Sequence, residues 1–228
     1  MKITLDLHVH THYSGCSNLR PDRIEPLALE RGLSTVAICD HNCLDGALET
    51  AALAKAITVI IAEEIVTTQG EIIGYFLREH IPPGLSPLET VAEIKRQGGL
   101  ASVPHPFDLL RSSRLHTSAL NQVLDSIDMI EIFNARNMFN RPDRNLLNRA
   151  QQLGVVPVMS SDAHLSCEIG RATMVMEHYE GPDEFLRNLR EATGFTRKSP
   201  LWVHAATKWI RFRNRKRAGG PPGTPCRS

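Results

Sequence analysis

The stretch that decides the fold is VPVMSSDAH at residues 156–164, where a short apolar run ends in Asp162 and His164. Both side chains can ligate a metal ion. The same arrangement opens the chain, where residues 3–7 lead into His8 and His10. Alternate side chains of a strand point to the same face, so these two histidines are expected on one side of a sheet. Both stretches predict a strand that carries metal ligands at its carboxyl end.

Short apolar runs alternate with segments of helical period along the first 200 residues. Several runs are apolar throughout, as in strands covered on both faces. A capping box with proline at the first helical position begins the third helix at residues 86–89. We expect strands at 3–7, 35–39, 57–61, 72–77, 100–104, 128–133 and 156–160, and helices at 21–31, 44–56, 87–97, 117–125, 140–153 and 183–193. The repeated order predicts parallel strands, in a barrel or a doubly wound sheet.

Polar side chains follow six of these strands at the carboxyl end. The carboxyl ends of a parallel barrel meet at one mouth, where the βα loops build active sites. Residues spread over more than 150 positions would therefore converge, which favours the barrel and predicts a metal site. The set is His8, His10, Asp40, His41, Glu63, Glu64, His105, Asn134, Arg136, Asp162 and His164.

Imidazoles combined with carboxylates suit Zn²⁺, Mn²⁺ or Fe²⁺, and a bridging carboxylate such as Glu64 or Asp162 suits two or three ions. Thiolate-rich structural zinc is not expected, because the cysteines form no CxxC pair. A multinuclear site can activate water and neutralise a transferring phosphoryl group, although carbon–nitrogen hydrolysis could use the same groups. Phosphoryl transfer is favoured by arginines that could hold phosphate oxygens, namely Arg136, Arg171 and either Arg111 or Arg114.

Together these motifs resemble the PHP (polymerase and histidinol phosphatase) domain, and most of all its small stand-alone metal-dependent phosphoesterases. The resemblance rests on DLHVHTxxS at 6–14, ICDHN at 38–42, EI at 64–65, PHPFD at 104–108, EIFNAR at 131–136 and SDAH at 161–164. It covers about residues 1–200 and implies an α/β fold, a distorted (β/α) barrel of seven strands in a single domain. It also implies hydrolysis of a phosphate ester, which we expect to be a small phosphorylated metabolite or a nucleotide.

Carried onto matching positions, the resemblance implies metal ligands at His8, His10, His41, Glu64, His105, Asp162 and His164. Cys16 stands where the family has an aspartate ligand, and its thiolate could bind an ion or be an inert residue. Glu71 stands where many trinuclear relatives have a further histidine, and it could ligate or face solvent. We therefore expect two or three divalent ions, Mn, Zn or Fe, with Cys16 as an additional candidate ligand.

The expected mechanism is in-line attack on phosphorus by a metal-bound hydroxide held between ions that Glu64 bridges, with Asp162 as a second catalytic carboxylate. His12 is a candidate acid for the leaving oxygen, and a solvent-facing position for it is equally open. The residues expected to bind the substrate are Asn134, Arg136 and Arg171.

Residues 201–217 predict a basic amphipathic helix, which could contact an anionic membrane or nucleic acid or could pack its tryptophans on the barrel. Residues 218–228 are expected to be disordered. The sequence shows no signal segment and no apolar run near the ~20 residues of a transmembrane helix, so we expect a cytoplasmic protein. A formal net charge of +1 argues against a global field for polyanions.

Two other functions remain open. The chain could be a degenerate PHP domain that acts as a binding or scaffold module through its basic C-terminal helix, which predicts poor metal retention. It could also be an amidohydrolase-like carbon–nitrogen hydrolase. No lysine follows an expected strand, where a carbamylated metal bridge would be needed, and this counts against the second alternative.

Overall fold

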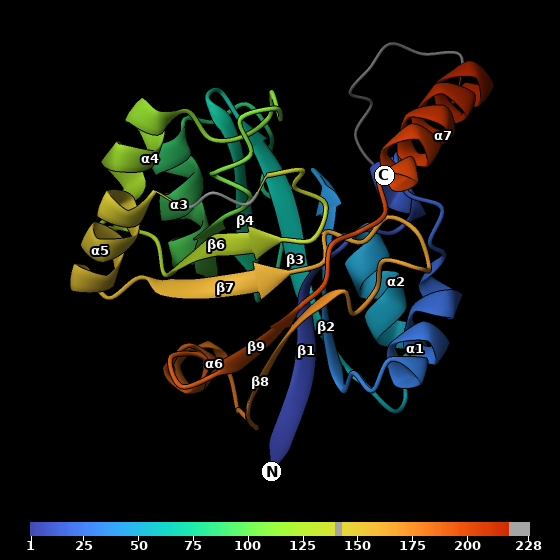
Figure 1. Cartoon of the computed structure of the whole chain (residues 1–228), viewed down its shortest axis with the longest axis horizontal. Helices are drawn as coiled ribbons and strands as arrows, with labels where there is room; N and C mark the ends of the chain where they lie inside the picture. Colours follow the sequence, from blue (N-terminus) through green and yellow to red (C-terminus); the bar gives the residue numbers. More distant parts are fainter. Residues whose placement is uncertain (140–142, 219–228) are drawn as a thin grey trace.

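The apolar runs form one curved sheet that nearly closes into a barrel (Figure 1). The structure is a computed structural model that describes residues 1–139 and 143–218. Within these residues the strands are β1 (Lys2–Val9), β2 (Thr35–His41), β3 (Thr58–Thr67), β4 (Gly70–Tyr75), β5 (Leu100–Val103), β6 (Met129–Asn134), β7 (Val156–Ser160), β8 (Ala172–Glu177) and β9 (Thr193–Thr196). Their order is β7-β6-β5-β4-β3-β2-β1-β8-β9. A parallel bridge between Val9 and Ala163 brings the end of β1 to the segment after β7, so the expected α/β barrel is confirmed.

The expectation of parallel strands throughout was wrong. β4 is antiparallel to both β3 and β5, and β8 and β9, which were not expected, are antiparallel to their neighbours. β3 extends to Thr67, so only Thr68 and Gln69 separate it from β4. Two residues can close a hairpin but cannot form the crossover that a parallel pair requires. The sheet therefore contains two parallel triplets, β1–β2–β3 and β5–β6–β7, joined by the reversed strand β4.

The helices follow the expected order along the chain. They are α1 (Pro21–Glu30), α2 (Asp45–Leu53), α3 (Pro87–Arg96), α4 (Thr117–Val123), α5 (Arg144–Gln152), α6 (Pro182–Leu189) and α7 (Trp202–Ala218). Figure 1 shows α1 and α2 at one side of the sheet and α3, α4 and α5 at the other. The expected capping box of α3 is confirmed, because the Glu89 N–H donates to Ser86 Oγ and the Ser86 N–H donates to Glu89 Oε2.

Two expectations fall partly on residues outside the described ranges. The first three residues of the helix expected at 140–153 are not described, and α5 begins at Arg144. Asp143 is the N-cap of α5 and accepts hydrogen bonds from the N–H groups of Asn145 and Leu146. The disordered tail expected at 218–228 lies outside the description except for Ala218, which ends α7. None of the described helices has both the length and the apolar character needed to cross a bilayer.

The sheet is covered on both sides, which explains its continuous apolar runs. One face of the central strands packs Leu5 and Ala37 with Phe185 of α6. The opposite face packs Val36 and Ile38 against α1. Asp6 and His8 alternate with buried apolar residues of β1 and are themselves fully buried, so their polar groups must be satisfied inside the fold.

Gly46, in the first turn of α2, allows this helix to approach the ends of β1 and β2. A methyl group at this position would overlap the Asp40 carboxylate and the Thr11 hydroxyl. These two groups are hydrogen bonded to each other, with Thr11 Oγ1 donating to Asp40 Oδ2 and the Thr11 N–H donating to Asp40 Oδ1 at 2.7 Å. The glycine is therefore required by packing, although alanine is the better helix former.

We predict that Gly46→Ala lowers the free energy of unfolding by about 1–3 kcal/mol, because overpacking outweighs the gain in helix propensity. Urea denaturation monitored by circular dichroism measures the change. Leu48→Ala, on the exposed side of the same helix, is the control and should change the free energy by less than about 0.5 kcal/mol. An alanine at position 46 that leaves stability equal or higher would contradict the close approach of α2.

Candidate metal centre

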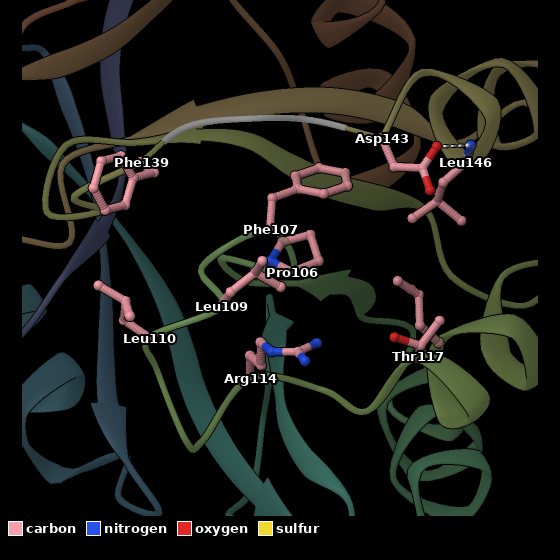
Figure 2. A pocket seen from close by; sticks show the side chains of 10 residues that line it. Pro106, Phe107, Leu109, Leu110, Arg114, Thr117, Phe139, Asp143 and Leu146 are labelled. Carbon is pink, nitrogen blue, oxygen red and sulfur yellow. Dashed lines mark hydrogen bonds between the residues drawn. The ribbon is translucent and has the colours of Figure 1, made fainter.

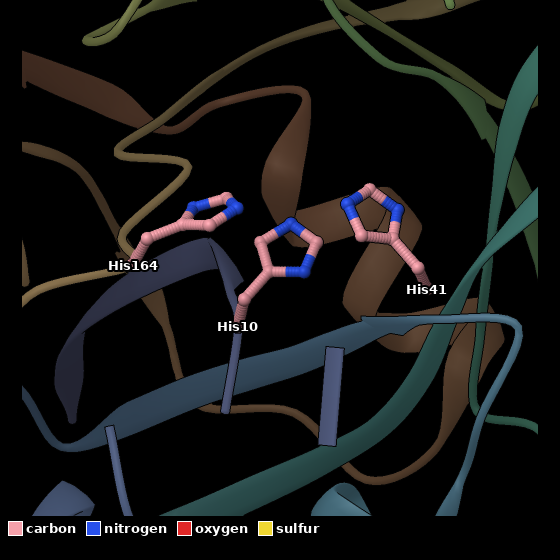
Figure 3. Close-up of side chains that lie close together, drawn as sticks. All are labelled: His10, His41 and His164. Atoms are coloured by element: carbon pink, nitrogen blue, oxygen red, sulfur yellow. The ribbon is translucent and has the colours of Figure 1, made fainter. Parts of the chain in front are cut away.

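The strand ends bring together the seven residues whose ligand role the sequence predicts. β1 supplies His8 and the adjoining His10, β2 supplies His41, and β3 supplies Glu64. His105 follows β5, and Asp162 and His164 follow β7. Six of these residues, all except His105, form three groups together with Glu71, and within each group the ligand atoms lie within 4.8 Å of one another. The groups are His8–His10–Asp162, His10–His41–His164 (Figure 3) and His41–Glu64–Glu71.

Glu64 and Asp162 lie at the centre of these groups. Glu64 Oε2 is 3.5 Å from His8 Nε2, 3.3 Å from His10 Nε2 and 3.0 Å from His41 Nδ1. Asp162 Oδ1 is 3.4 Å from His10 Nε2 and 3.5 Å from His164 Nδ1. The other oxygen of each carboxylate is held by a protein group, with His105 Nε2 2.8 Å from Glu64 Oε1 and Arg111 Nη2 2.7 Å from Asp162 Oδ2. Each carboxylate thus keeps one oxygen directed at the imidazoles.

The two central oxygens, Glu64 Oε2 and Asp162 Oδ1, are buried without a hydrogen-bond partner. The same is true of Glu71 Oε2 and His41 Nδ1. Buried polar atoms are usually satisfied, and a buried carboxylate is costly unless it is paired or coordinates a metal. The donor set of imidazoles and carboxylates also fits a divalent ion such as Zn²⁺, Mn²⁺ or Fe²⁺. The residues present therefore fit a metal centre.

The electrostatics of the ligand residues favour positive charge. Burial by itself lowers the pKa of His8, but the negative charges of Asp162 and Glu131 raise it well above the ordinary value. Burial raises the pKa of Asp162, but Arg111 and His8 hold it well below the usual range. The carboxylates thus stabilise positive charge among the imidazoles, and a bound cation would supply it.

A second layer of polar residues orients the histidines. Glu131 Oε1 lies 2.8 Å from His8 Nδ1, and Ser160 Oγ donates to the same carboxylate oxygen. His10 Nδ1 lies 2.9 Å from Ser14 Oγ, which in turn donates to Asp40. Such partners fix the ring orientation and the tautomer of a metal-ligating histidine. The roles of Glu131, Ser14 and Asp40 were not identified from the sequence, although all three belong to the motifs that carry the PHP resemblance.

Glu71 is buried and belongs to the cluster. Its carboxylate oxygens lie 3.6 Å from His41 Nδ1 and 3.6 Å from His105 Nε2, so the solvent-facing alternative is wrong. Because β4 runs antiparallel, its amino end and not its carboxyl end lies at the mouth. His80, on the connection that follows β4, has its Nδ1 2.7 Å from Glu63 Oε1 and belongs to none of the three ligand groups.

Cys16 is fully buried and lies beside the histidines. Burial raises the pKa of its thiol, but the neighbouring charges of His41 and His10 lower it to about 7. A lowered pKa makes deprotonation easier, and the thiolate is the form of cysteine that binds a metal ion. Cys39 provides the contrast, since burial raises the pKa of its thiol well above the ordinary value.

Two of the cluster residues have strained backbones. His105 and Asp162 adopt φ values of +35° and +53°, in the left-handed region that non-glycine residues rarely occupy. Each stands at the end of a strand, where the turn aims its side chain into the cluster. Backbone strain of this kind persists only where surrounding contacts enforce it, and it gathers at functional sites.

The arginines at the mouth make different contacts. Arg136, which is 5 % exposed, donates from Nη2 to Thr207 Oγ1 at 2.7 Å, and its Nη1 lies 3.6 Å from Glu168 Oε2. Arg171 donates to the carbonyl oxygens of Cys167 and Lys198, both at 2.8 Å. Arg111 reaches the cluster through Asp162. Arg114 lines a separate apolar cavity of about 580 Å³ with Phe107, Leu109 and Leu110 (Figure 2), and the lining of that cavity includes no cluster residue.

The remaining two candidates are Asn134, which contacts a ligand residue, and His12, which belongs to none of the ligand groups. Asn134 is fully buried, and its Nδ2 donates to Glu131 Oε2 at 3.0 Å and to Asp162 Oδ2 at 3.3 Å. His12 is exposed in a short 3₁₀ helix (His12–Ser14), with its ring centroid 4.6 Å from that of Tyr13.

Solved structures show that this fold occurs in several proteins. A two-domain protein of Bacteroides vulgatus that contains a predicted PHP-like metal-dependent phosphoesterase is similar over 92 % of this chain and 70 % of that one, with a TM-score of 0.68 and 13 % identity. PsfC of Pseudomonas syringae covers 93 % and 98 %, with a TM-score of 0.65 and 14 % identity. An amidohydrolase of Chromobacterium violaceum covers 89 % and 96 %, with a TM-score of 0.54 and 16 % identity. The fold alone therefore does not distinguish a phosphoesterase from an amidohydrolase.

Proteins found by sequence similarity share a higher sequence identity with this chain than these solved structures do. Two uncharacterized proteins of Methanocaldococcus jannaschii match this chain, one at 44 % identity over 143 residues (57 % of this chain and 81 % of that one) and one at 33 % over 199 residues (83 % and 80 %). The model of the PHP domain matches residues 6–195, which include every residue of the three ligand groups. The chain therefore belongs to the PHP domain family.

Proposed function

We propose that this protein is a metal-dependent phosphoesterase that hydrolyses the phosphate ester of a small metabolite or nucleotide. The observation that carries the proposal is a pair of buried oxygens, Glu64 Oε2 and Asp162 Oδ1, that have no hydrogen bond and face histidine side chains. They occur in a chain of the PHP domain family. His8, His10, Cys16, His41, Glu64, His105, Asp162 and His164 are the proposed ligands, and Glu71 joins them on its contacts with His41 and His105.

Divalent ions bound there would lower the pKa of a water molecule, orient it and neutralise phosphoryl oxygens. Glu64 is suited to bridge neighbouring positions, because one of its oxygens faces His105 and the other faces His10 and His41. Asp162 is held by Arg111 on one side and keeps its other oxygen for the cluster.

Substrate contacts are proposed for Asn134 and Arg136, with Arg111 as an addition from the structure. Asn134 and Arg111 both approach Asp162, and an arginine can present two parallel N–H groups to a phosphate. Arg171 and His12 are weaker proposals, because the former already bonds to main-chain carbonyl groups and the latter is exposed.

The two alternatives make different demands on the site. A scaffold module would not need buried carboxylate oxygens without partners, which destabilise a fold that binds no cation. A carbon–nitrogen hydrolase with a carbamylated lysine would need a lysine at the cluster. Lys95 pairs with Asp128 and Lys198 donates to the Met138 carbonyl oxygen, both away from the ligand groups.

Elemental analysis of protein purified without added metal or chelator should find about two or three divalent ions per chain, because the donors form more than one group. The same assay should find fewer ions in His8→Ala and in His41→Ala, since each removes a donor. His178→Ala, at an exposed position, is the matched control and should retain the wild-type content. Wild-type protein that stays nearly free of metal after incubation with Mn²⁺ or Zn²⁺ would refute the metal centre.

Metal-loaded wild-type protein should release phosphate from at least one member of a panel containing p-nitrophenyl phosphate, nucleoside monophosphates and sugar phosphates. Glu64→Gln keeps the size of the side chain but removes its charge, and we expect a loss of activity on the order of 100-fold or more. Glu191→Gln, at an exposed position, should leave the rate unchanged. Cleavage of cyclic amides with no phosphate release from any ester would favour the carbon–nitrogen hydrolase.

A further inference from the structure

The C-terminal helix α7 contacts the loops that carry the metal centre. Asn214 Nδ2 donates to the Gly15 carbonyl oxygen at 3.0 Å, immediately before Cys16. Thr207 Oγ1 accepts the hydrogen bond from Arg136. Val203 and Ile210 are buried against Leu165, the residue that follows His164. The helix is therefore anchored at the mouth of the barrel.

The side of α7 turned toward the mouth carries polar residues beside the buried Val203 and Ile210. Residues 204, 207, 211 and 214 are spaced by three, four and three positions, so they share one helix face. Two of them, Thr207 and Asn214, make the hydrogen bonds to the mouth loops. The opposite face carries exposed Trp209 and Phe212, so the side with these polar residues and Val203 and Ile210 meets the barrel, and the aromatic side does not. This excludes the packing of Trp209 on the barrel that the sequence left open.

The other two residues of this face are His204 and Arg211. Arg211 is exposed and lies one turn from both Thr207 and Asn214, whose side chains bond to the mouth loops, and His204 is half-buried one turn before Thr207. Among the described residues, neither side chain has a carboxylate within ion-pair distance. Arg111 and Arg136, by contrast, are already held by Asp162 and Glu168. This face of α7 therefore carries, next to the loops of the metal centre, a guanidinium without an ion-pair partner among the described residues and an imidazole.

We propose that α7 forms one wall of the substrate site, where Arg211 and His204 contact the phosphate group of the ester. This inference rests on the proposed phosphoesterase function. A guanidinium that no carboxylate holds can offer both of its parallel N–H groups to phosphate oxygens. The half-buried ring of His204 can donate a hydrogen bond to the same group. A wall of this kind also limits the room for the leaving group, in agreement with a small substrate.

Titration calorimetry of Mn²⁺-loaded, full-length protein with inorganic phosphate tests the contact without requiring turnover. Arg211→Ala should weaken phosphate binding about tenfold or more, the usual effect of removing one charge-assisted contact. The phosphate affinity of Arg211→Lys should lie between those of Arg211→Ala and the wild type, because lysine keeps the positive charge but lacks the two parallel N–H groups of arginine. His204→Ala should weaken binding to a smaller extent. In kinetics with a hydrolysed ester, Arg211→Ala should raise KM more than it lowers kcat.

Arg213→Ala is the matched control, since it removes the same charge from an exposed position of the same helix on another face. Its affinity for phosphate and the metal content of every variant should equal those of the wild type. Equal weakening in Arg211→Ala and Arg213→Ala would indicate a general field and overturn the contact, as would an unchanged affinity in Arg211→Ala. A wild-type protein that binds no phosphate would overturn the contact as well.

The outcomes separate this inference from the proposed function. Hydrolysis by the wild type with no specific effect of Arg211→Ala would leave the phosphoesterase standing and remove α7 from its site. Phosphate binding that depends on Arg211, in a metal-loaded protein that hydrolyses no ester, would keep the contact as an anion site and refute the hydrolase.

Discussion

The structure depends on the placement of two buried carboxylates, Glu64 and Asp162, among imidazoles. An ionised carboxylate is expensive to bury, and each of these keeps one oxygen that faces imidazole nitrogens without a hydrogen bond. A fold tolerates this arrangement when a cation is available to complete it. The strained backbone at Asp162 and His105 has the same origin, because the turns that end two strands must direct donors to a common point.

The support for this arrangement is built in successive layers. Glu131 faces His8, and Asp40 reaches His10 through Ser14, so neither imidazole is free to turn. Gly46 then lets α2 close over Asp40. Residues that offer no ligand atom to the site are therefore constrained by the ligand residues through direct contacts. This explains why the motifs of the family extend beyond the ligands to residues such as Ser14 and Glu131.

The sequence predicted the strands, the barrel and the clustering of the ligands because strand ends gather at one mouth whatever the details of packing. It did not predict the direction of β4, since hydrophobic period gives the position of a strand but not its orientation. That error also obscured Glu71, which reaches the cluster from an amino end. The contacts of Arg136 and Arg171 could not be predicted either, because they are made with α7 and with main-chain groups distant in the sequence.

The reversed strand β4 divides the sheet into two parallel halves, and the ligands are divided in the same way. β1, β2 and β3 carry His8, His41 and Glu64, whereas β5 and β7 lead into His105 and Asp162. An ion held by donors from both halves would act as a non-covalent cross-link between segments that are distant along the chain. Because its donors converge only in the folded chain, its binding free energy would add to the stability of the folded state and couple the two halves. Loss of the ion would then lower the stability of the whole barrel and not only that of the site.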